Sequence, residues 1–223
     1  MKIGLIYTST TPELIELVER EVRMALGEGV ELLSWQDPSI LADIRAAGYV
    51  EAAPAARLVS LYMQAVSAGC QALLNLCSSV GEVADSVQSL ARYLGVPIVR
   101  VDEAMCRQAV RSGARIAVVA TLPTTMAPTK ATLYRVAREM GKRVTLLECL
   151  VEGAFGLDQD AFRARMAQHI DAVAEEAEVI LFAQGSMAYC EAYIADVYQK
   201  PVLSSPRFGA AALRRALEER GSL

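Results

Sequence analysis

Cys77 is the side chain whose type and position in the sequence could do chemistry most directly. It follows the apolar stretch at residues 72–76 and precedes Ser78-Ser79-Val80-Gly81, which predicts that a strand ends and a helix begins at the thiol. A thiol at a helix N-terminus has a lowered pKa and can act as a base or nucleophile near neutral pH. Three other cysteines are expected to be small hydrophobic residues of the core: Cys70, Cys106 and Cys149.

The other residue types that often do chemistry are scarce or widely spaced. His169 is the one histidine of the chain, so a mechanism that needs two histidines is excluded. A lone histidine in a stretch of helical period is typical of a surface or half-buried structural residue. The five cysteines are an odd number with no Cys-x-x-Cys pair. This pattern favours free thiols in a reducing, cytoplasmic compartment over a disulfide framework or a metal site.

Polar loops follow four apolar, strand-like stretches of the sequence. Strand and helix patterns alternate along the chain, which predicts parallel sheets covered by helices on both faces. Ligands of such sheets bind beyond the carboxyl ends of the strands, where helix N-termini offer N–H groups to a carboxylate or phosphate. The same hydroxyls could instead serve only as helix caps. The candidate substrate-binding residues in these loops are Thr8, Ser9, Ser78, Ser79, Thr121, Thr124, Thr125, Gly185 and Ser186.

The two halves of the chain resemble each other in order and spacing. Residues 2–8 align with residues 115–121, an offset of 115 − 2 = 113. Residues 74–79 align with residues 181–186, an offset of 181 − 74 = 107. The repeat predicts two pseudo-symmetric α/β lobes, each a parallel sheet covered by helices, with the active-site cleft between them.

The lobes are expected to divide the chain at two places. The first lobe is predicted to comprise residues 1–97 and 206–223, and the second residues 98–205. The last helix is assigned to the first lobe because the termini of a domain tend to lie close together. The predicted strands lie at residues 3–7, 30–35, 72–76, 98–101, 115–120, 144–147, 179–182 and 201–203.

Composition and charge exclude several classes of protein. The net charge is 22 − 26 = −4, which argues against a nucleic-acid binder because such a surface must neutralise phosphates. No apolar run reaches the roughly 18 residues of a membrane span, and no signal peptide is evident. The sequence has no Gly-x-x-x-x-Gly-Lys or Gly-x-Gly-x-x-Gly element, so no nucleotide cofactor is expected.

Three segments together resemble the aspartate/glutamate/hydantoin racemase superfamily: Asn75-Leu76-Cys77-Ser78-Ser79, Gln184-Gly185-Ser186-Met187-Ala188 and the Thr-rich loop at Thr121. The resemblance covers essentially the whole chain. It implies two pseudo-symmetric α/β lobes, no cofactor, and a small carboxylate substrate bound in the cleft between the lobes. Arylmalonate decarboxylases and maleate cis-trans isomerases share this scaffold, on which homodimers are common.

The resemblance assigns roles to two residues. Racemases of the family use two cysteines, one from each lobe, on opposite faces of the α-carbon of the substrate. Cys77 matches the first of them, whereas Gln184 stands where the second is expected. A primary amide cannot remove an α-proton near neutral pH, but it can orient a carboxylate through hydrogen bonds. Cys190, further along the following helix, could replace the missing thiol but is expected to face away from the site.

Three functions remain open at this point. In the first, a racemase or isomerase pairs Cys77 with an unconventional partner such as Glu103 or a bound water. In the second, Cys77 works alone, either protonating an enediolate after decarboxylation or adding to an alkene as in maleate isomerisation. In the third, the protein binds a carboxylate without turnover. Arg207, which follows the last strand, could pair with a second substrate carboxylate or be a solvated surface residue.

Overall fold

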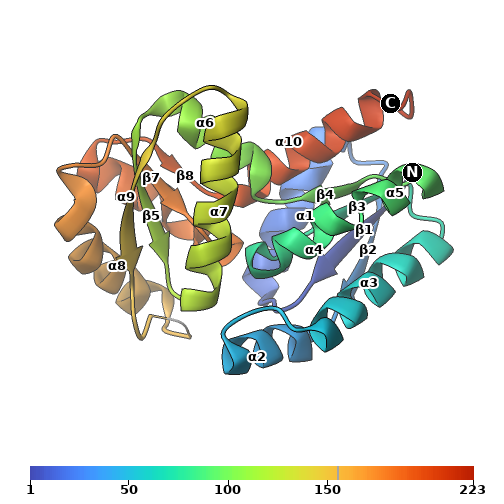
Figure 1. Cartoon of the computed structure of the whole chain (residues 1–223), viewed down its shortest axis with the longest axis horizontal. Coiled ribbons are helices and arrows are strands. Elements are labelled where there is room, and N and C mark those ends of the chain that lie inside the picture. The colour runs from blue at the N-terminus through green and yellow to red at the C-terminus, as the bar shows by residue number, and fades with distance from the viewer. Residues whose placement is uncertain (155) are drawn as a thin grey trace. The chain divides into compact units, whose positions relative to one another are not determined.

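The computed structural model describes residues 1–154 and 156–223 (Figure 1). The sequence predicts a Gly-containing loop at residues 151–160, and residue 155 within it lies outside the described part of the chain. The chain divides into two units, Met1–Val101 with Pro206–Leu223, and Asp102–Ser205. The first division therefore follows Val101 and not residue 97, because the strand Ile98–Arg100 pairs with the sheet of the first unit.

The first unit contains a four-stranded parallel sheet. Its strands are β1 (Lys2–Tyr7), β2 (Glu31–Gln36), β3 (Ala72–Asn75) and β4 (Ile98–Arg100), in the order β2-β1-β3-β4. Almost all residues of β1 and β3 are buried, as expected for strands covered on both faces. The order reverses between β1 and β3, so the carboxyl ends of these two strands form the place where such sheets bind ligands.

Helices cover both faces of this sheet. On one face, α1 (Pro12–Leu26) and α10 (Ser205–Glu218) enclose an apolar core with β1 and β3. Figure 1 shows α10, near the C-terminus, beside α1. The predicted packing of the last helix on the first unit is confirmed. Thr11 caps α1 by accepting a hydrogen bond from the Leu14 N–H at 3.3 Å, and Pro12 opens the helix as expected.

The opposite face is covered by α2 (Pro38–Ala47), α3 (Ala52–Ser67), α4 (Gly81–Ser86) and α5 (Gln88–Leu94), which share a second apolar core with the sheet. The helix α2 was not predicted from the sequence. Its signals were local: Asp37 accepts the cap hydrogen bond from the Ser39 N–H at 3.0 Å, Pro38 opens the helix, and Gly48 closes it in the left-handed conformation. Such caps mark a short helix even where the apolar period is weak.

The second unit repeats the same architecture. Its parallel strands are β5 (Arg115–Ala120), β6 (Thr145–Leu150), β7 (Val179–Phe182) and β8 (Val202–Leu203), in the order β6-β5-β7-β8. Each position in this order has its counterpart in the first unit, with β5 matching β1 and β7 matching β3. The predicted two-sheet α/β fold is confirmed.

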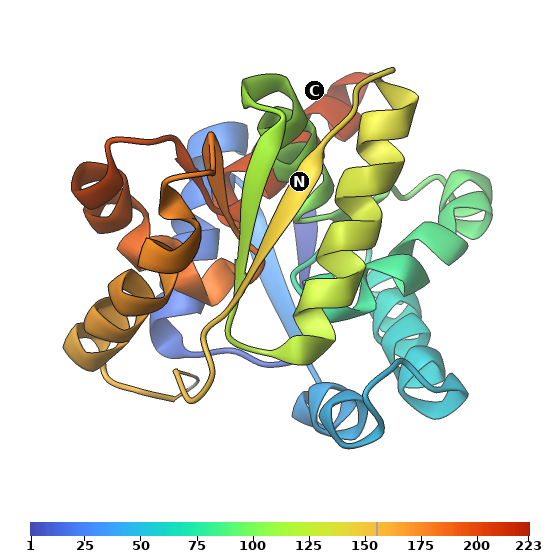
Figure 2. The same ribbon diagram turned by 60° about the vertical axis from the view of Figure 1, so that its left-hand side comes forward.

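Two pairs of helices cover the second sheet. The pair α6 (Glu103–Ser112) and α7 (Pro123–Glu139) packs on one face, and Figure 2 shows α7 running beside β5 and β6. The pair α8 (Gln159–Ala174) and α9 (Glu191–Tyr198) closes an apolar core on the other face. In the described part of the chain, no helix is long and apolar enough to cross a membrane.

Candidate active site

The carboxyl ends of β1 and β3 bring together the thiol and one of the predicted hydroxyls in the first unit. Thr8 directly follows β1 and is buried. Cys77 lies two residues beyond β3, at the start of the 3₁₀ helix η1 (Ser78–Val80). Cys77 is half-buried, whereas Ser78 and Ser79 are buried. The elements thus place the predicted thiol at the ligand-binding edge of the sheet.

The electrostatics of Cys77 differ from the expectation for a helix N-terminus. Burial raises the pKa of the Cys77 thiol, and hydrogen bonds from the Thr8 hydroxyl and from the N–H groups of Ser79 and Val80 oppose the rise without cancelling it. The expected lowering of the pKa is therefore wrong. A 3₁₀ helix of three residues aligns few peptide dipoles, so desolvation prevails. The resting side chain is a protonated thiol at neutral pH.

The hydroxyl of Thr8 bonds the Cys77 sulfur and is available to a ligand that binds beside the thiol. Thr8 is 1% exposed, and among the described residues its Oγ1 has no nitrogen or oxygen partner. Buried hydroxyls in native proteins are normally hydrogen-bonded. A bound carboxylate or enediolate could therefore accept a hydrogen bond from Thr8. Ser9, the next predicted binding residue, is half-buried.

The carboxyl ends of β5 and β7 carry the corresponding residues of the second unit. The Gln184 amide oxygen accepts a hydrogen bond from the Thr121 N–H at 2.7 Å, and the amide nitrogen donates to the Thr121 hydroxyl at 2.7 Å. An amide has a second N–H, which these two bonds do not use. Gln184 is therefore held in one orientation by its own unit.

The remaining predicted residues of the second unit lie on the two helical segments that follow. Thr124 and Thr125 are in the first turn of α7, where the Thr124 Oγ1 is a buried atom without a partner among the described residues. Gly185 and Ser186 open the 3₁₀ helix η2 (Gly185–Cys190). Gly185 is half-buried and Ser186 is exposed.

The internal repeat makes the two edges directly comparable. Thr8 corresponds to Thr121 and Cys77 to Gln184, at the offsets 121 − 8 = 113 and 184 − 77 = 107. In both units the residue beyond the third strand in sequence reaches the threonine beyond the first. In the first unit this contact leaves a thiol that can carry a proton, and in the second it immobilises an amide that cannot.

The alternative acid/base groups are engaged elsewhere in the second unit. Cys190 is 0% exposed within the apolar core under α8 and α9, as expected for a residue that faces away. Glu103 accepts hydrogen bonds from Arg107 at 2.8 Å and from Arg135 at 2.8 Å. Burial raises the pKa of Glu103, but the bonds from Arg135 and Arg107 outweigh it and the pKa is lowered. His169 lies within α8, where its Nδ1 contacts the Arg165 carbonyl at 3.0 Å.

Arg207 lies in the first turn of α10. Gly209 packs against Val101 so closely that an added Cβ would lie 2.8 Å from a side-chain carbon of Val101. This contact brings the first turn of α10 to the carboxyl end of β4, within the first unit. The Arg207 guanidinium is exposed and lies 4.7 Å from the centre of the Phe208 ring. Its predicted pairing with a second substrate carboxylate stays a prediction.

Asn75 and Arg100, which support the turn at Cys77, were not predicted from the sequence. Asn75, the last residue of β3, is 1% exposed and hydrogen-bonds both Tyr62 and the backbone of Cys77. Arg100, at the end of β4, is 6% exposed and pairs with Asp85 at 2.6 Å. An asparagine ending an otherwise apolar strand was the available signal, because a buried amide needs hydrogen-bond partners.

No group of three or more His, Cys, Asp or Glu side chains in the described residues could hold a metal ion.

Comparison with solved structures finds the same fold in enzymes. Allantoin racemase from Klebsiella pneumoniae is 20% identical with a TM-score of 0.67, over 99% of this chain and 89% of that one. Glutamate racemase from Francisella tularensis in complex with D-glutamate is 14% identical with a TM-score of 0.70, over 100% and 82%. Unliganded arylmalonate decarboxylase is 14% identical with a TM-score of 0.57, over 96% and 92%. No curated protein matches the chain.

The sequence also matches a family model over nearly its whole length. The model of the Asp/Glu/Hydantoin racemase family aligns with residues 3–213, a range that includes Thr8, Cys77, Thr121 and Gln184. The resemblance identified from the sequence motifs is thereby confirmed. The chain belongs to the Asp/Glu/Hydantoin racemase family and is an isomerase of the racemase type.

Proposed function

We propose that this isomerase moves a proton at the carbon next to a carboxylate of a small molecule, with Cys77 as the acid/base. One observation carries the proposal: a half-buried thiol lies at the switch point of the first sheet, beside the buried hydroxyl of Thr8, which bonds the sulfur and no nitrogen or oxygen atom of the described residues. A proton carrier and a hydrogen-bond donor for a developing oxyanion are thus adjacent. No cofactor takes part in the proposed reaction.

The proposed reaction balances with the groups of the first unit. The Cys77 thiolate removes the α-proton, and the electron pair of the broken C–H bond delocalises onto the carboxylate as an enediolate. Hydroxyl and N–H donors at Thr8, Ser78 and Ser79 stabilise the negative charge, as preorganised donors do for enolates. Reprotonation of the carbon then completes the exchange.

The amide at the equivalent position of the second unit does not replace the thiol. Gln184 cannot take or give an α-proton near neutral pH, and its bonds to Thr121 leave one N–H that can donate to a carboxylate. Glu103 is bound by two arginines. We therefore propose water as the second proton carrier when the configuration inverts.

One-thiol decarboxylation is the second candidate, and the protonation state of Cys77 favours it. Burial raises the pKa of this thiol, so at neutral pH the side chain is ready to donate a proton. A decarboxylase needs only that donation: the C–C bond to the leaving carboxylate breaks, carbon dioxide departs, and the thiol protonates the resulting enediolate. The fold of arylmalonate decarboxylase is similar to this chain. Addition of the Cys77 thiolate to an alkene, as in maleate isomerisation, uses the same sulfur.

Incubation with candidate substrates in deuterated water tests the proposal. We expect α-deuterium incorporation into at least one small carboxylate, which Cys77→Ala lowers by about a hundredfold or more. Cys190→Ala is the matched control, because it removes a core thiol and should retain the exchange. Carbon dioxide release from substituted malonates without exchange would select the decarboxylase instead.

Two outcomes would overturn the assignment of Cys77. Exchange that survives in Cys77→Ala would exclude this thiol as the acid/base. Thermal stabilisation by carboxylates that is equal in the parent protein and in Cys77→Ala, without exchange, decarboxylation or alkene isomerisation in either, would indicate a carboxylate-binding protein.

A further inference from the structure

We infer that Asn75 and Tyr62 are positioning residues for the thiol: Tyr62 orients the Asn75 amide, and that amide holds the backbone of Cys77 in the conformation that directs the sulfur toward its hydrogen-bond donors. The inference rests on the proposed role of Cys77 and adds two residues that are hydrogen-bonded to each other and, through Asn75, to the backbone of Cys77. Four observations of the first unit support it.

The Asn75 side chain joins strand, turn and helix. Its amide nitrogen donates to the Cys77 carbonyl at 3.1 Å, and its amide oxygen accepts from the Tyr62 hydroxyl at 3.0 Å. A carbonyl can only accept, so the nitrogen of the amide must face Cys77 and the oxygen must face Tyr62. The two bonds therefore define a single orientation of the amide.

The bond to the Cys77 carbonyl lies just beyond the last hydrogen bonds between β3 and its neighbouring strands. The Leu76 N–H donates to Ile6 at 2.9 Å and the Asn75 carbonyl accepts from Val101 at 3.0 Å, and these are the last backbone bonds of β3 to its neighbouring strands. Beyond them, the Cys77 carbonyl is held by the Val80 N–H at 3.4 Å and by the Asn75 amide. The direction of this carbonyl sets the path of the turn whose N–H groups face the sulfur.

Tyr62 is suited to a fixed donor role. It is 0% exposed in α3, and burial raises the pKa of its phenol, with the Cys77 charge acting in the same direction. The hydroxyl therefore stays protonated and donates to Asn75. Because α3 is packed in the apolar core, the position of the Tyr62 hydroxyl is fixed.

Arg100 holds the far end of the same turn. A Cβ at Gly81 would lie 2.3 Å from the nearest nitrogen of the Arg100 guanidinium, so the arginine packs directly on the first residue of α4. It also pairs with Asp85 at 2.6 Å on the same helix. The segment from Cys77 to Gly81 is thus held at both ends by buried polar side chains.

The second unit lacks this arrangement where it lacks the thiol. Phe182 occupies the position equivalent to Asn75, at the offset 182 − 75 = 107, and is 0% exposed in the apolar core. The repeated fold therefore accepts a hydrocarbon side chain at the end of this strand. The buried amide is found in the half in which a reactive group must be oriented.

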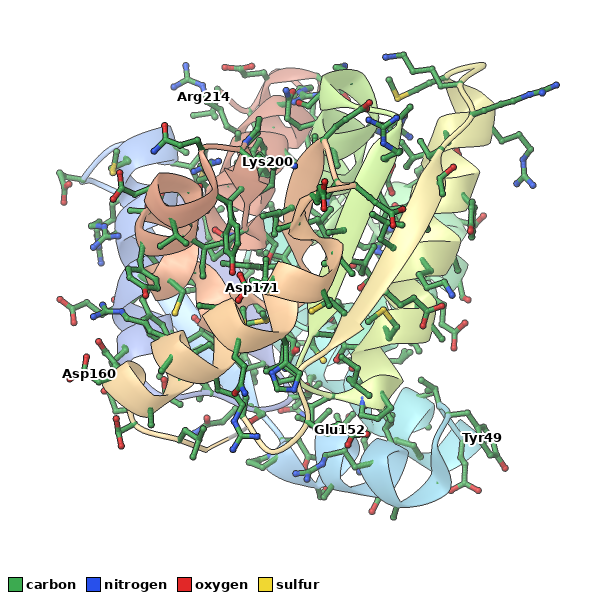
Figure 3. All side chains as sticks on the ribbon, turned by 90° about the vertical axis from the view of Figure 1, so that its left-hand side faces the viewer. Tyr49, Glu152, Asp160, Asp171, Lys200 and Arg214 are labelled. Carbon is green, nitrogen blue, oxygen red and sulfur yellow. The ribbon has the colours of Figure 1, made fainter. Side chains whose placement is uncertain are left out.

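The test compares Tyr62→Phe with Tyr198→Phe. Each change removes one hydroxyl that donates to protein oxygens; Tyr198 bonds the Ala167 carbonyl and Asp171 on α8, both at 2.7 Å. Figure 3 shows Asp171 on α8, in the second unit. The readout is the pH dependence of iodoacetamide alkylation of Cys77, followed by mass spectrometry of its peptide, alongside kcat and KM for deuterium exchange.

Tyr62→Phe is expected to move the midpoint of Cys77 alkylation to higher pH and to lower kcat by roughly threefold to tenfold, because a displaced turn weakens about one of the hydrogen bonds to the thiolate. KM should change less than kcat, and Tyr198→Phe should leave the alkylation midpoint in place. Equal midpoints in the two variants would overturn the inference.

Asn75→Ala tests whether Tyr62 acts through the amide. It should shift the midpoint in the same direction as Tyr62→Phe, and the double variant should show no further shift. Additive shifts would exclude a relay from Tyr62 through Asn75. If Cys77→Ala retains activity while Tyr62→Phe still moves the alkylation midpoint, the proposed function fails and the positioning inference stands. If Cys77→Ala abolishes activity while Tyr62→Phe leaves the midpoint in place, the proposed function stands and the positioning inference fails.

Discussion

At the scale of single residues, the chemistry of this protein depends on two equivalent positions with different side chains. Cys77 and Gln184 follow corresponding strands, and each reaches a corresponding threonine, Thr8 or Thr121. A thiol can exchange a proton with a substrate, whereas an amide can only make hydrogen bonds. The proposed reaction therefore has one protein group for proton transfer, Cys77, and the protonation state of this thiol sets the rate.

The pH dependence of activity should report that state. Because burial raises the pKa of Cys77, the thiolate is a minor species at neutral pH. Its fraction, and with it the rate of α-proton exchange, should rise about tenfold per pH unit until the pH reaches the raised pKa. Decarboxylation, which needs the thiol, should instead be constant at neutral pH and fall above that pKa. Rates measured from pH 6 to about pH 10 distinguish a rising profile from a falling one.

At the scale of elements, ion pairs link two helices of the second unit. Glu103 and Arg107 on α6 and Arg135 and Glu139 on α7 form a network, with Glu139 accepting from Arg135 at 2.9 Å. Hydrogen bonds from Arg135 and Arg107 lower the pKa of Glu139, and the pKa of Glu103 is lowered too, against the effect of burial. These contacts assign Glu103 a structural role in the packing of α6 on α7.

Glu103→Gln tests that role through acid stability. A carboxyl whose pKa is lowered in the folded state stabilises the protein above its unfolded pKa, about 4.3 for glutamate, and the contribution is lost as the pH falls below it. We expect Glu103→Gln to lower the free energy of unfolding by up to about 1 kcal/mol at pH 7. The difference from the parent protein should shrink at about pH 3 to 4 in urea titrations. Loss of deuterium exchange in this variant would instead point to an acid/base role.

At the scale of the whole molecule, one architecture occurs twice and the chain returns to close its first copy. Both sheets have the same strand order, and the segment Pro206–Leu223 belongs to the first unit although it follows the second in sequence. Leu213 and Leu217 of α10 are 0% exposed against the sheet of the first unit. The first unit therefore needs the last residues of the chain to complete its core.

Leu213→Ala measures that requirement. Removing a fully buried leucine side chain should lower the free energy of unfolding by about 2 to 5 kcal/mol. Arg215→Ala, at an exposed position of the same helix, is the control and should change it by less than about 0.5 kcal/mol. Equal denaturation midpoints for the two variants would contradict the packing of α10 in this core.

Much of the fold could be predicted from residue patterns. The strands at residues 115–120 and 179–182 were located with their observed bounds, because short apolar runs between turn signals mark buried strands. The helix α2 was missed because its caps at Asp37 and Gly48 carry the signal and its apolar face is short. The division after Val101 was placed four residues early because strand pairing, not local composition, assigns β4 to the first unit.

The sequence by itself determined the two-fold repeat, the family and the identity of Cys77 and Gln184 as counterparts, because each follows from residue types and their spacing along the chain. Only the tertiary structure decided the raised pKa of the thiol, the bonds that tie Gln184 to Thr121, and the support of Cys77 by Asn75 and Tyr62. Desolvation and hydrogen bonding depend on which distant segments surround a group once the chain has folded.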